Sequence, residues 1–184
     1  MLLSFLATLL VTSPTPTDTT VTISTVKREL TGDGVPEVLS LTGTGPTIDS
    51  LNVTFTIESL GRRLYSTTWI QRRADFGGPR RLSDIEFRAR LNEYASEFFE
   101  DSRFMSPEGF VSWLRRDARL HIPLIPDVIS HQMPRPDSTR ARKVWEEMQT
   151  AGITIFEFSP GGDAVMSIGW SATDKRFYNL LECC

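Results

Sequence analysis

The chain has 184 residues, of which 40% are hydrophobic and 23% are charged, and its formal net charge at pH 7 is −3. This length suits one domain with a hydrophobic core, and this composition excludes an intrinsically disordered chain. A net charge so close to zero gives no electrostatic reason to bind nucleic acid, so we expect no nucleic-acid partner.

The first eleven residues are a short apolar run, and a segment rich in threonine and proline follows from Thr12 to Asp18. The run is too short to span a bilayer as a helix, but its length is typical of the apolar part of a secretory signal. We therefore predict a signal peptide and linker over residues 1–17, a single domain over 18–184, no transmembrane segment, and a secreted or periplasmic location. The alternatives are an N-terminal run that folds into the core and an intracellular protein.

A strand and then a tight turn are predicted next. β-branched residues alternate with polar ones from Thr19 to Val26, which is typical of a half-buried strand. Gly32 and Gly34 flank Asp33, so the backbone can take positive φ on either side of a carboxylate. The chain therefore turns around an acidic side chain.

Oxygen-bearing groups recur through this turn at the spacing that calcium loops use. The predicted ligands are the side chains of Glu29, Thr31, Asp33 and Glu37 and the carbonyl of Val35. The stretch from Glu29 to Glu37 resembles the Asp-Gly loops of FG-GAP and VCBS-type repeats, which join two strands. Because the stretch occurs once, the resemblance implies a local calcium-binding geometry and no propeller. The ligands are few and imperfect, so we expect a Kd on the order of 10⁻⁴–10⁻³ M. The alternative is a plain turn, in which Asp33 accepts hydrogen bonds from nearby backbone N–H groups.

Alternating apolar residues predict three further strands, over residues 37–41, 51–57 and 64–70, and a loop follows. This predicted loop carries four arginines, namely Arg72, Arg73, Arg80 and Arg81. Guanidinium groups suit carboxylates and phosphates, so one hypothesis is an anionic ligand such as an acidic glycan or a phospholipid headgroup. The alternative is a solvated edge that prevents sheets from aggregating.

Three helices are predicted after this loop. Ser83 and Glu86 have the spacing of a capping box for a helix that ends near Asp101. Ser-Pro at residues 106–107 begins a second helix, and Asp137 or Ser138 caps a third over residues 139–150. Four prolines between the second and third helices predict an irregular segment.

The last third of the chain returns to strands, over residues 153–158, 164–170 and 175–181. The order of elements is typical of an α+β fold. We predict that the β-meander and the C-terminal β-hairpin share one sheet, with about three helices on one face.

Catalytic patterns are scarce in this sequence, which has no Gly-x-Ser-x-Gly elbow, phosphate loop or dinucleotide fingerprint. The adjacent terminal residues Cys183 and Cys184 have no neighbouring partners that would indicate a structural zinc site. We interpret the chain as an exported, non-enzymatic binding or envelope-associated module. The alternative is a metal-dependent hydrolase that uses His121 and His131, with Asp127 and Asp137 as further ligands.

Overall fold

The computed structural model describes residues 19–47, 49–77, 81–116, 125–161 and 164–183. The predicted signal peptide, Arg80, His121 and Cys184 lie outside the described residues.

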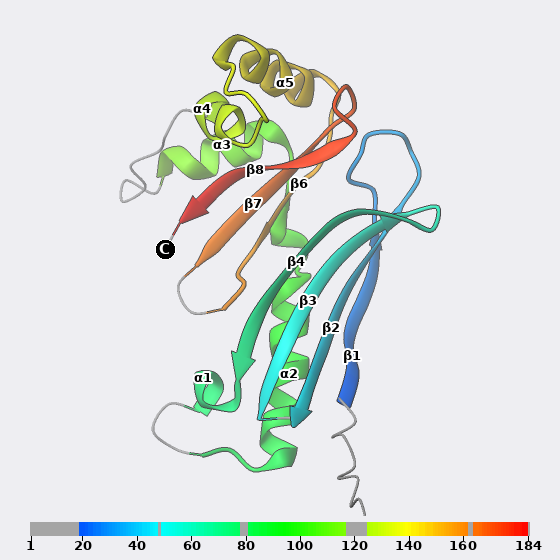
Figure 1. Cartoon of the computed structure of the whole chain (residues 1–184), viewed down its shortest axis with the longest axis vertical. Helices are drawn as coiled ribbons and strands as arrows, with labels where there is room; N and C mark the ends of the chain where they lie inside the picture. Colours follow the sequence, from blue (N-terminus) through cyan, green and yellow to red (C-terminus); the bar gives the residue numbers. More distant parts are fainter. Residues whose placement is uncertain (1–18, 48, 78–80, 117–124, 162–163, 184) are drawn as a thin grey trace, which may run out of the picture.

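The first half of the chain forms an antiparallel sheet, here called sheet A, whose strands follow one another in chain order (Figure 1). Alternation along the third strand buries Leu51, Val53, Phe55 and Ile57 completely, while Thr54 lies on the other face. There the Thr54 and Thr68 hydroxyls are 3.0 Å apart across two strands. The predicted meander is confirmed, and its strands are β1 (Thr19–Arg28), β2 (Glu37–Thr47), β3 (Ser50–Ser59) and β4 (Arg62–Arg72).

Strand β2 is longer than predicted, because Gly43 and Gly45 lie within it and do not end it. A Cβ on Gly43 would come within 3.1 Å of the Leu51 Cδ1 atom, and one on Gly45 would lie 2.4 Å from the Ser50 carbonyl oxygen. These glycines permit close approach between strands β2 and β3.

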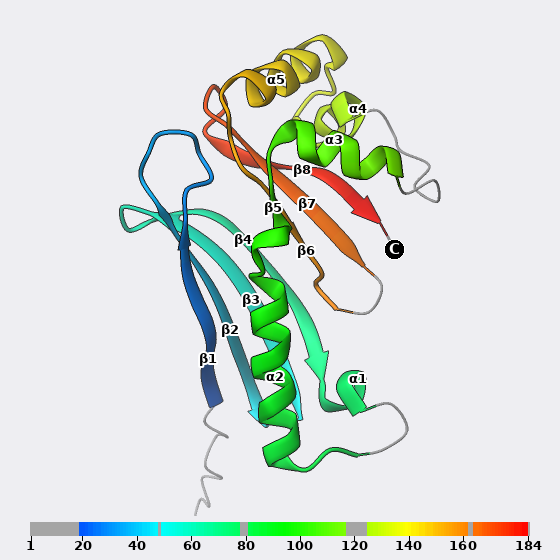
Figure 2. The same ribbon diagram turned by 180° about the vertical axis from the view of Figure 1, so that it is seen from behind.

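Two helices follow sheet A. The segment predicted as an arginine-rich loop contains helix α1 (Arg73–Gly77), which corrects that prediction. Helix α2 (Asp84–Phe98) begins with the predicted capping box, in which Ser83 and Glu86 each accept from the other's backbone N–H. Helix α2 runs along sheet A (Figure 2) and buries Phe87, Leu91 and Phe98.

The second half of the chain forms another antiparallel sheet, here called sheet B, and three helices. The short 3₁₀ helix η1 (Asp101–Arg103) leads into it. Its strands, which pair in this order, are β5 (Phe104–Met105), β6 (Ile155–Phe158), β7 (Val165–Ser171) and β8 (Arg176–Cys183). The helices are α3 (Pro107–Arg116), α4 (Ile125–His131) and α5 (Ser138–Thr150).

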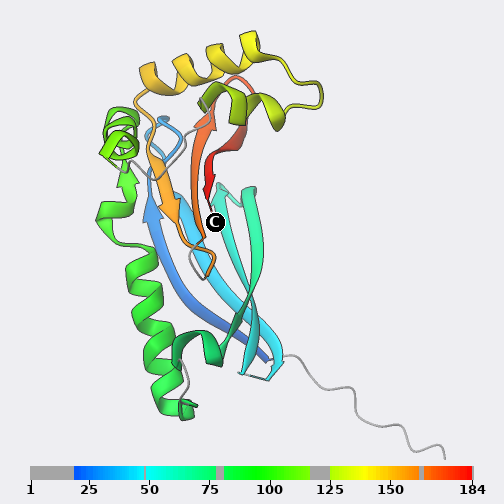
Figure 3. The same cartoon turned by 90° about the vertical axis from the view of Figure 1, so that its left-hand side faces the viewer.

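The α+β class is confirmed, but the predicted arrangement in one sheet with about three helices is wrong. The meander and the C-terminal strands form two separate four-stranded sheets, and the described residues contain five α-helices. Figure 3 shows α2 along one side of the sheets and α5 at one end of the molecule. Alternation identifies the buried face of a strand, but it does not reveal which strand pairs with it.

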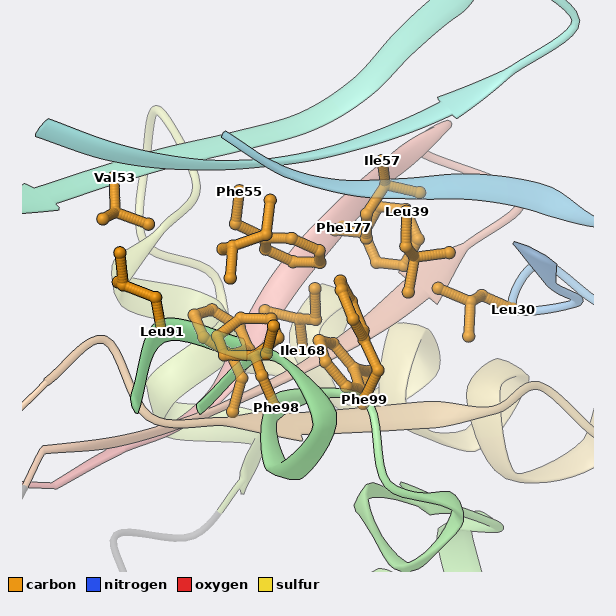
Figure 4. Packing of buried hydrophobic residues seen from close by; sticks show 14 of the residues in the cluster. Leu30, Leu39, Val53, Phe55, Ile57, Leu91, Phe98, Phe99, Ile168 and Phe177 are labelled. Atoms are coloured by element: carbon orange, nitrogen blue, oxygen red, sulfur yellow. The ribbon is translucent and has the colours of Figure 1, made fainter. Parts of the chain in front are cut away.

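The strands form two sheets because sheet B has buried residues on both of its faces and is packed between two layers. Phe156 and Phe177 belong to a cluster with sheet A and α2, in which Phe55 and Phe98 pack edge to face with ring centres 5.3 Å apart (Figure 4). Ile155 belongs to a second cluster, with residues of α3, α4 and α5. Sheet B is therefore covered by sheet A and α2 on one face and by helices on the other.

No helix in the described part of the chain is both long and apolar enough to cross a bilayer.

Candidate functional site

The predicted calcium loop is a tight turn with the expected backbone geometry. Gly32 and Gly34 have φ of 78° and 80°, as predicted. Glu37 is completely buried, and its two carboxylate oxygens accept hydrogen bonds from the Leu30 N–H at 2.7 Å and the Thr31 hydroxyl at 3.0 Å. The hydrogen bonds of Glu37 thus connect the start of the loop with the start of β2.

The other two acidic side chains of the loop also have donors. A Glu29 oxygen accepts from the Gly32 N–H at 2.5 Å, and an Asp33 oxygen accepts from the Val35 N–H at 2.8 Å. Within the described ranges, no three His, Cys, Asp or Glu side chains gather where they could hold a metal ion. Calcium binding stays a prediction, and a calcium ion would share the Glu37 oxygens with two protein donors.

The predicted arginine cluster is divided among different roles. Arg73 is buried. Its Nε atom forms an ion pair with an Asp49 oxygen at 2.5 Å, although the two atoms do not have hydrogen-bond geometry. One of its terminal nitrogens donates a hydrogen bond to Asp84 at 2.6 Å. Arg81 lies 3.4 Å from the second Asp49 oxygen, whereas Arg72 is exposed. Arg73 is therefore a structural cation, and an anionic ligand at the other arginines stays a prediction.

The segment of the hydrolase hypothesis contains helix α4, which ends at the exposed His131. Asp137 caps helix α5 by accepting from the Thr139 and Arg140 N–H groups at 3.0 and 2.9 Å. His121 lies outside the described residues, so the hydrolase hypothesis stays a prediction.

A cavity of about 740 Å³ is lined by residues of β4, α2 and the turn after β6. Helix α1 and the 3₁₀ helix complete its wall. It is lined by Ile70, Gln71, Asp75, Phe76, Tyr94, Glu97, Phe98, Arg103, Ser159, Pro160 and Gly161. Its residues come from five segments, so only the folded chain forms it.

Gln71 is the unusual residue of this wall. It is only 3% exposed, and its amide nitrogen donates to Asp75 at 3.2 Å, but its oxygen Oε1 is buried without a hydrogen-bond partner among the described residues. A Cβ on the lining residue Gly161 would lie 3.3 Å from that oxygen. An unpaired buried acceptor costs about 1–3 kcal/mol, so the Gln71 oxygen is an acceptor in this wall that the described residues leave unsatisfied.

Trp69 and Tyr94 add polar groups beside Gln71. The Trp69 indole nitrogen is buried and has no hydrogen-bond partner in the described part of the chain, and its ring stacks on Phe98 with centres 5.9 Å apart. The Tyr94 hydroxyl donates to the Ser159 carbonyl at 2.9 Å. Burial raises the pKa of Tyr94 well above its usual value, and the nearby Trp69 N–H offsets part of that rise. Tyr94 is thus a neutral phenol at pH 7.

Charged side chains lie at the exposed side of the cavity. Asp75 and Glu97 are exposed carboxylates, and Arg103 donates to the buried carboxylate of Glu157 at 2.5 Å. The charge of Arg103 is therefore balanced within the protein. Asp75 accepts through one oxygen, Oδ2, from the Arg72 N–H at 2.7 Å and from Gln71. The cavity as a whole presents an excess of acceptors and negative charge.

Sequence analysis missed every residue of this cavity as a functional residue. The one local signal for the cavity is Gln71, a polar residue at an inward-facing position of β4. Inward-facing positions of a strand are normally apolar, so a glutamine there is unexpected.

Comparison with known proteins found no matching family model, no matching curated protein and no matching solved structure. The class of this protein is therefore defined by its architecture: an α+β protein with two antiparallel sheets and a polar cavity beside them.

Proposed function

We propose that this protein is an exported, non-enzymatic binding module that takes a small polar ligand in the cavity between β4, α2 and the turn after β6. The observation that carries the proposal is the buried, partnerless Oε1 atom of Gln71 in the cavity wall. Buried polar groups in proteins are normally hydrogen-bonded, and exceptions cluster where a ligand or ordered water completes the set. The volume is within the range of small-molecule sites.

A screen of small amines, sugars, amino acids and carboxylates by ¹H–¹⁵N NMR tests the proposal. The chain has four tryptophans, and the three others serve as internal controls. Trp113 packs on Phe110, Trp145 lies at another surface pocket, and Trp170 lies in a cavity of about 490 Å³ beside the Glu29–Glu37 loop. We expect a ligand to shift the Trp69 indole N–H and leave the other three unchanged.

The matched variants are Gln71→Met, which removes the partnerless acceptor, and Gln149→Met, which changes an exposed glutamine on α5. Ligand binding should be lost in the first variant and kept in the second. A screen in which no compound shifts Trp69, or in which Gln71→Met binds as well as the parent chain, contradicts the proposal.

Export is the second part of the proposal, and it rests on the apolar N-terminal run of the sequence. The mass of the protein purified from its native host tests it. We expect the loss of about the first seventeen residues. A full-length mass would favour the intracellular alternative.

Calcium binding at the Glu29–Glu37 loop is tested by calorimetric titration of residues 18–184, with Asp33→Ala alongside. Saturable binding that the variant loses supports the predicted site. The absence of binding up to about 10 mM, beyond the weak extracellular range, leaves a turn closed by its own hydrogen bonds.

A further inference from the structure

We infer that the ligand of the Gln71 cavity is a small organic amine that is bound as a cation. This inference rests on the proposed function and adds the chemical class of the ligand. Three features of the cavity carry it: the charge of its wall, the kind of hydrogen-bonding atom left unpaired, and the aromatic surface beside them.

The charge of the wall selects a cation. Two carboxylates, Asp75 and Glu97, line the cavity, and Arg103 is the one basic residue among the described residues that line it. Glu157 balances Arg103 at 2.5 Å, so an arriving ligand meets two carboxylates that no described basic residue of the wall neutralises. Among the described residues, none donates to the Glu97 carboxylate, and those that donate to Asp75 use only its Oδ2 oxygen. An anionic ligand would be repelled, whereas a cation gains a charge-assisted hydrogen bond.

The unpaired atom of Gln71 selects an N–H donor. Amide oxygens accept hydrogen bonds, and Gln71 Oε1 is buried without a donor at the cavity wall. A protonated amine carries up to three donors on one atom, so it can serve Gln71 and a carboxylate at once. This acceptor also distinguishes the site from a mere group of surface acids, because the acids alone would leave a cation in solvent.

Aromatic rings supply the remaining wall. Phe76 and Tyr94 meet edge to face with centres 5.8 Å apart, and Tyr94 and Phe98 are also 5.8 Å apart. All three rings line the cavity. Ring faces attract organic cations, and ring edges pack against the apolar body that carries the amine. The wall therefore suits an amine attached to an apolar group.

Calorimetry at pH 7 on the full chain with three probes of similar size tests this inference. The probes are 2-phenylethylamine, which is cationic, 2-phenylethanol, which is neutral, and 3-phenylpropanoate, which is anionic. We expect the amine to bind at least ten times more tightly than the alcohol, and the carboxylate to bind most weakly. Raising the salt concentration from about 50 to 500 mM should weaken the amine alone, since salt screens charge.

Two variants on the same helix sharpen the test. Glu97→Gln should weaken the amine about tenfold and leave the alcohol unchanged. Glu93→Gln, which alters an exposed carboxylate that pairs with Arg90 and does not line the cavity, should change neither. Equal effects of the two variants would overturn the role of Glu97 and with it the amine assignment.

The outcomes separate this inference from the proposed function. Binding of the alcohol or the carboxylate as tightly as the amine overturns the amine class while the cavity keeps its role as a ligand site. Binding of none of the three probes overturns the amine class too, and the broader NMR screen then decides the proposed function independently.

Discussion

The Glu29–Glu37 loop and the Gln71 cavity both place a buried polar side chain among other polar groups, but they differ in what is paired. In the loop, both oxygens of Glu37 have donors within 3.0 Å. In the cavity, no described residue donates to the oxygen of Gln71. A recognisable acidic pattern thus marks a turn that is closed by its own hydrogen bonds, whereas a residue outside any pattern offers a free acceptor. An acidic pattern in the sequence and an unpaired polar atom in the fold are therefore separate observations, and the ligand site that we propose rests on the second.

The largest expected effect is on the loop. Glu37→Ala leaves the buried Leu30 N–H and the Thr31 hydroxyl without their acceptor, so we expect a loss of about 3 kcal/mol in the free energy of unfolding. Urea unfolding measures it. Glu37→Gln keeps an acceptor oxygen, so it should lose about 1 kcal/mol and provides a folded variant if alanine is not tolerated. A loss below about 1 kcal/mol in Glu37→Ala would mean that the loop is not held by this residue.

The next effect is on the pH dependence of stability and involves the cavity. Tyr94 is buried, so its pKa in the folded protein lies above the value of about 10 in the unfolded chain. Above pH 10 the unfolded state releases this proton first, so stability is fully present below pH 10 and falls as the pH rises. The limiting slope for one tyrosine is about 1.4 kcal/mol per pH unit.

Urea unfolding of the parent chain and of Tyr94→Phe between about pH 9 and 11 measures that slope. The variant should lose stability less steeply than the parent. The stability of the variant should still fall over this range through Tyr65 and Tyr178, because burial raises the pKa of each to about 12. Identical slopes in the two proteins would show that Tyr94 ionises as freely as in the unfolded chain.

A smaller effect of opposite sign is expected at Gln71. Gln71→Met removes an unpaired buried acceptor and keeps the length of the side chain. It also removes the donor to Asp75, but Asp75 is exposed and keeps the Arg72 N–H, so stability should rise by about 1 kcal/mol. Gln132 is the matched control, because it donates to the Asn179 carbonyl at 2.7 Å and accepts from the Asn179 N–H at 2.8 Å. Gln132→Met should destabilise the protein by about 2 kcal/mol. A similar loss of stability in Gln71→Met and Gln132→Met would show that Gln71, like Gln132, has a hydrogen-bond partner within the protein. The contrast between the cavity and the loop would then disappear.

The smallest effect is expected at Asp33. Its side chain is exposed and accepts one hydrogen bond, from the Val35 N–H, so Asp33→Ala should cost about 0.5 kcal/mol in the absence of calcium. Thermal unfolding measures the change. A cost as large as that of Glu37→Ala would show that the turn depends on Asp33 and not on the buried glutamate.

Local signals were sufficient for much of the fold. Alternation from Leu51 to Ile57 predicts β3, and the Ser83 and Glu86 pair predicts the start of α2, because these signals act within a few residues. Helix α4 was missed because prolines surround it. Pro126 lies at the second position of this helix, where no intrahelical N–H bond is lost, and the burial of Ile125 and Ile129 stabilises a helix that propensity alone would not predict.

The class of fold, the positive-φ turn around Asp33 and most of the strands and helix caps can be predicted from the amino-acid sequence, since each depends on neighbours in the chain. The division of the strands into two sheets depends on long-range packing, because Phe156 and Ile155 are buried on opposite faces of β6 against different partners. The tertiary structure also decided which polar groups are paired. Glu37 meets donors six and seven residues away, whereas the surroundings of Gln71 come from α2 and from a turn about ninety residues later, so its missing partner follows from packing and not from sequence.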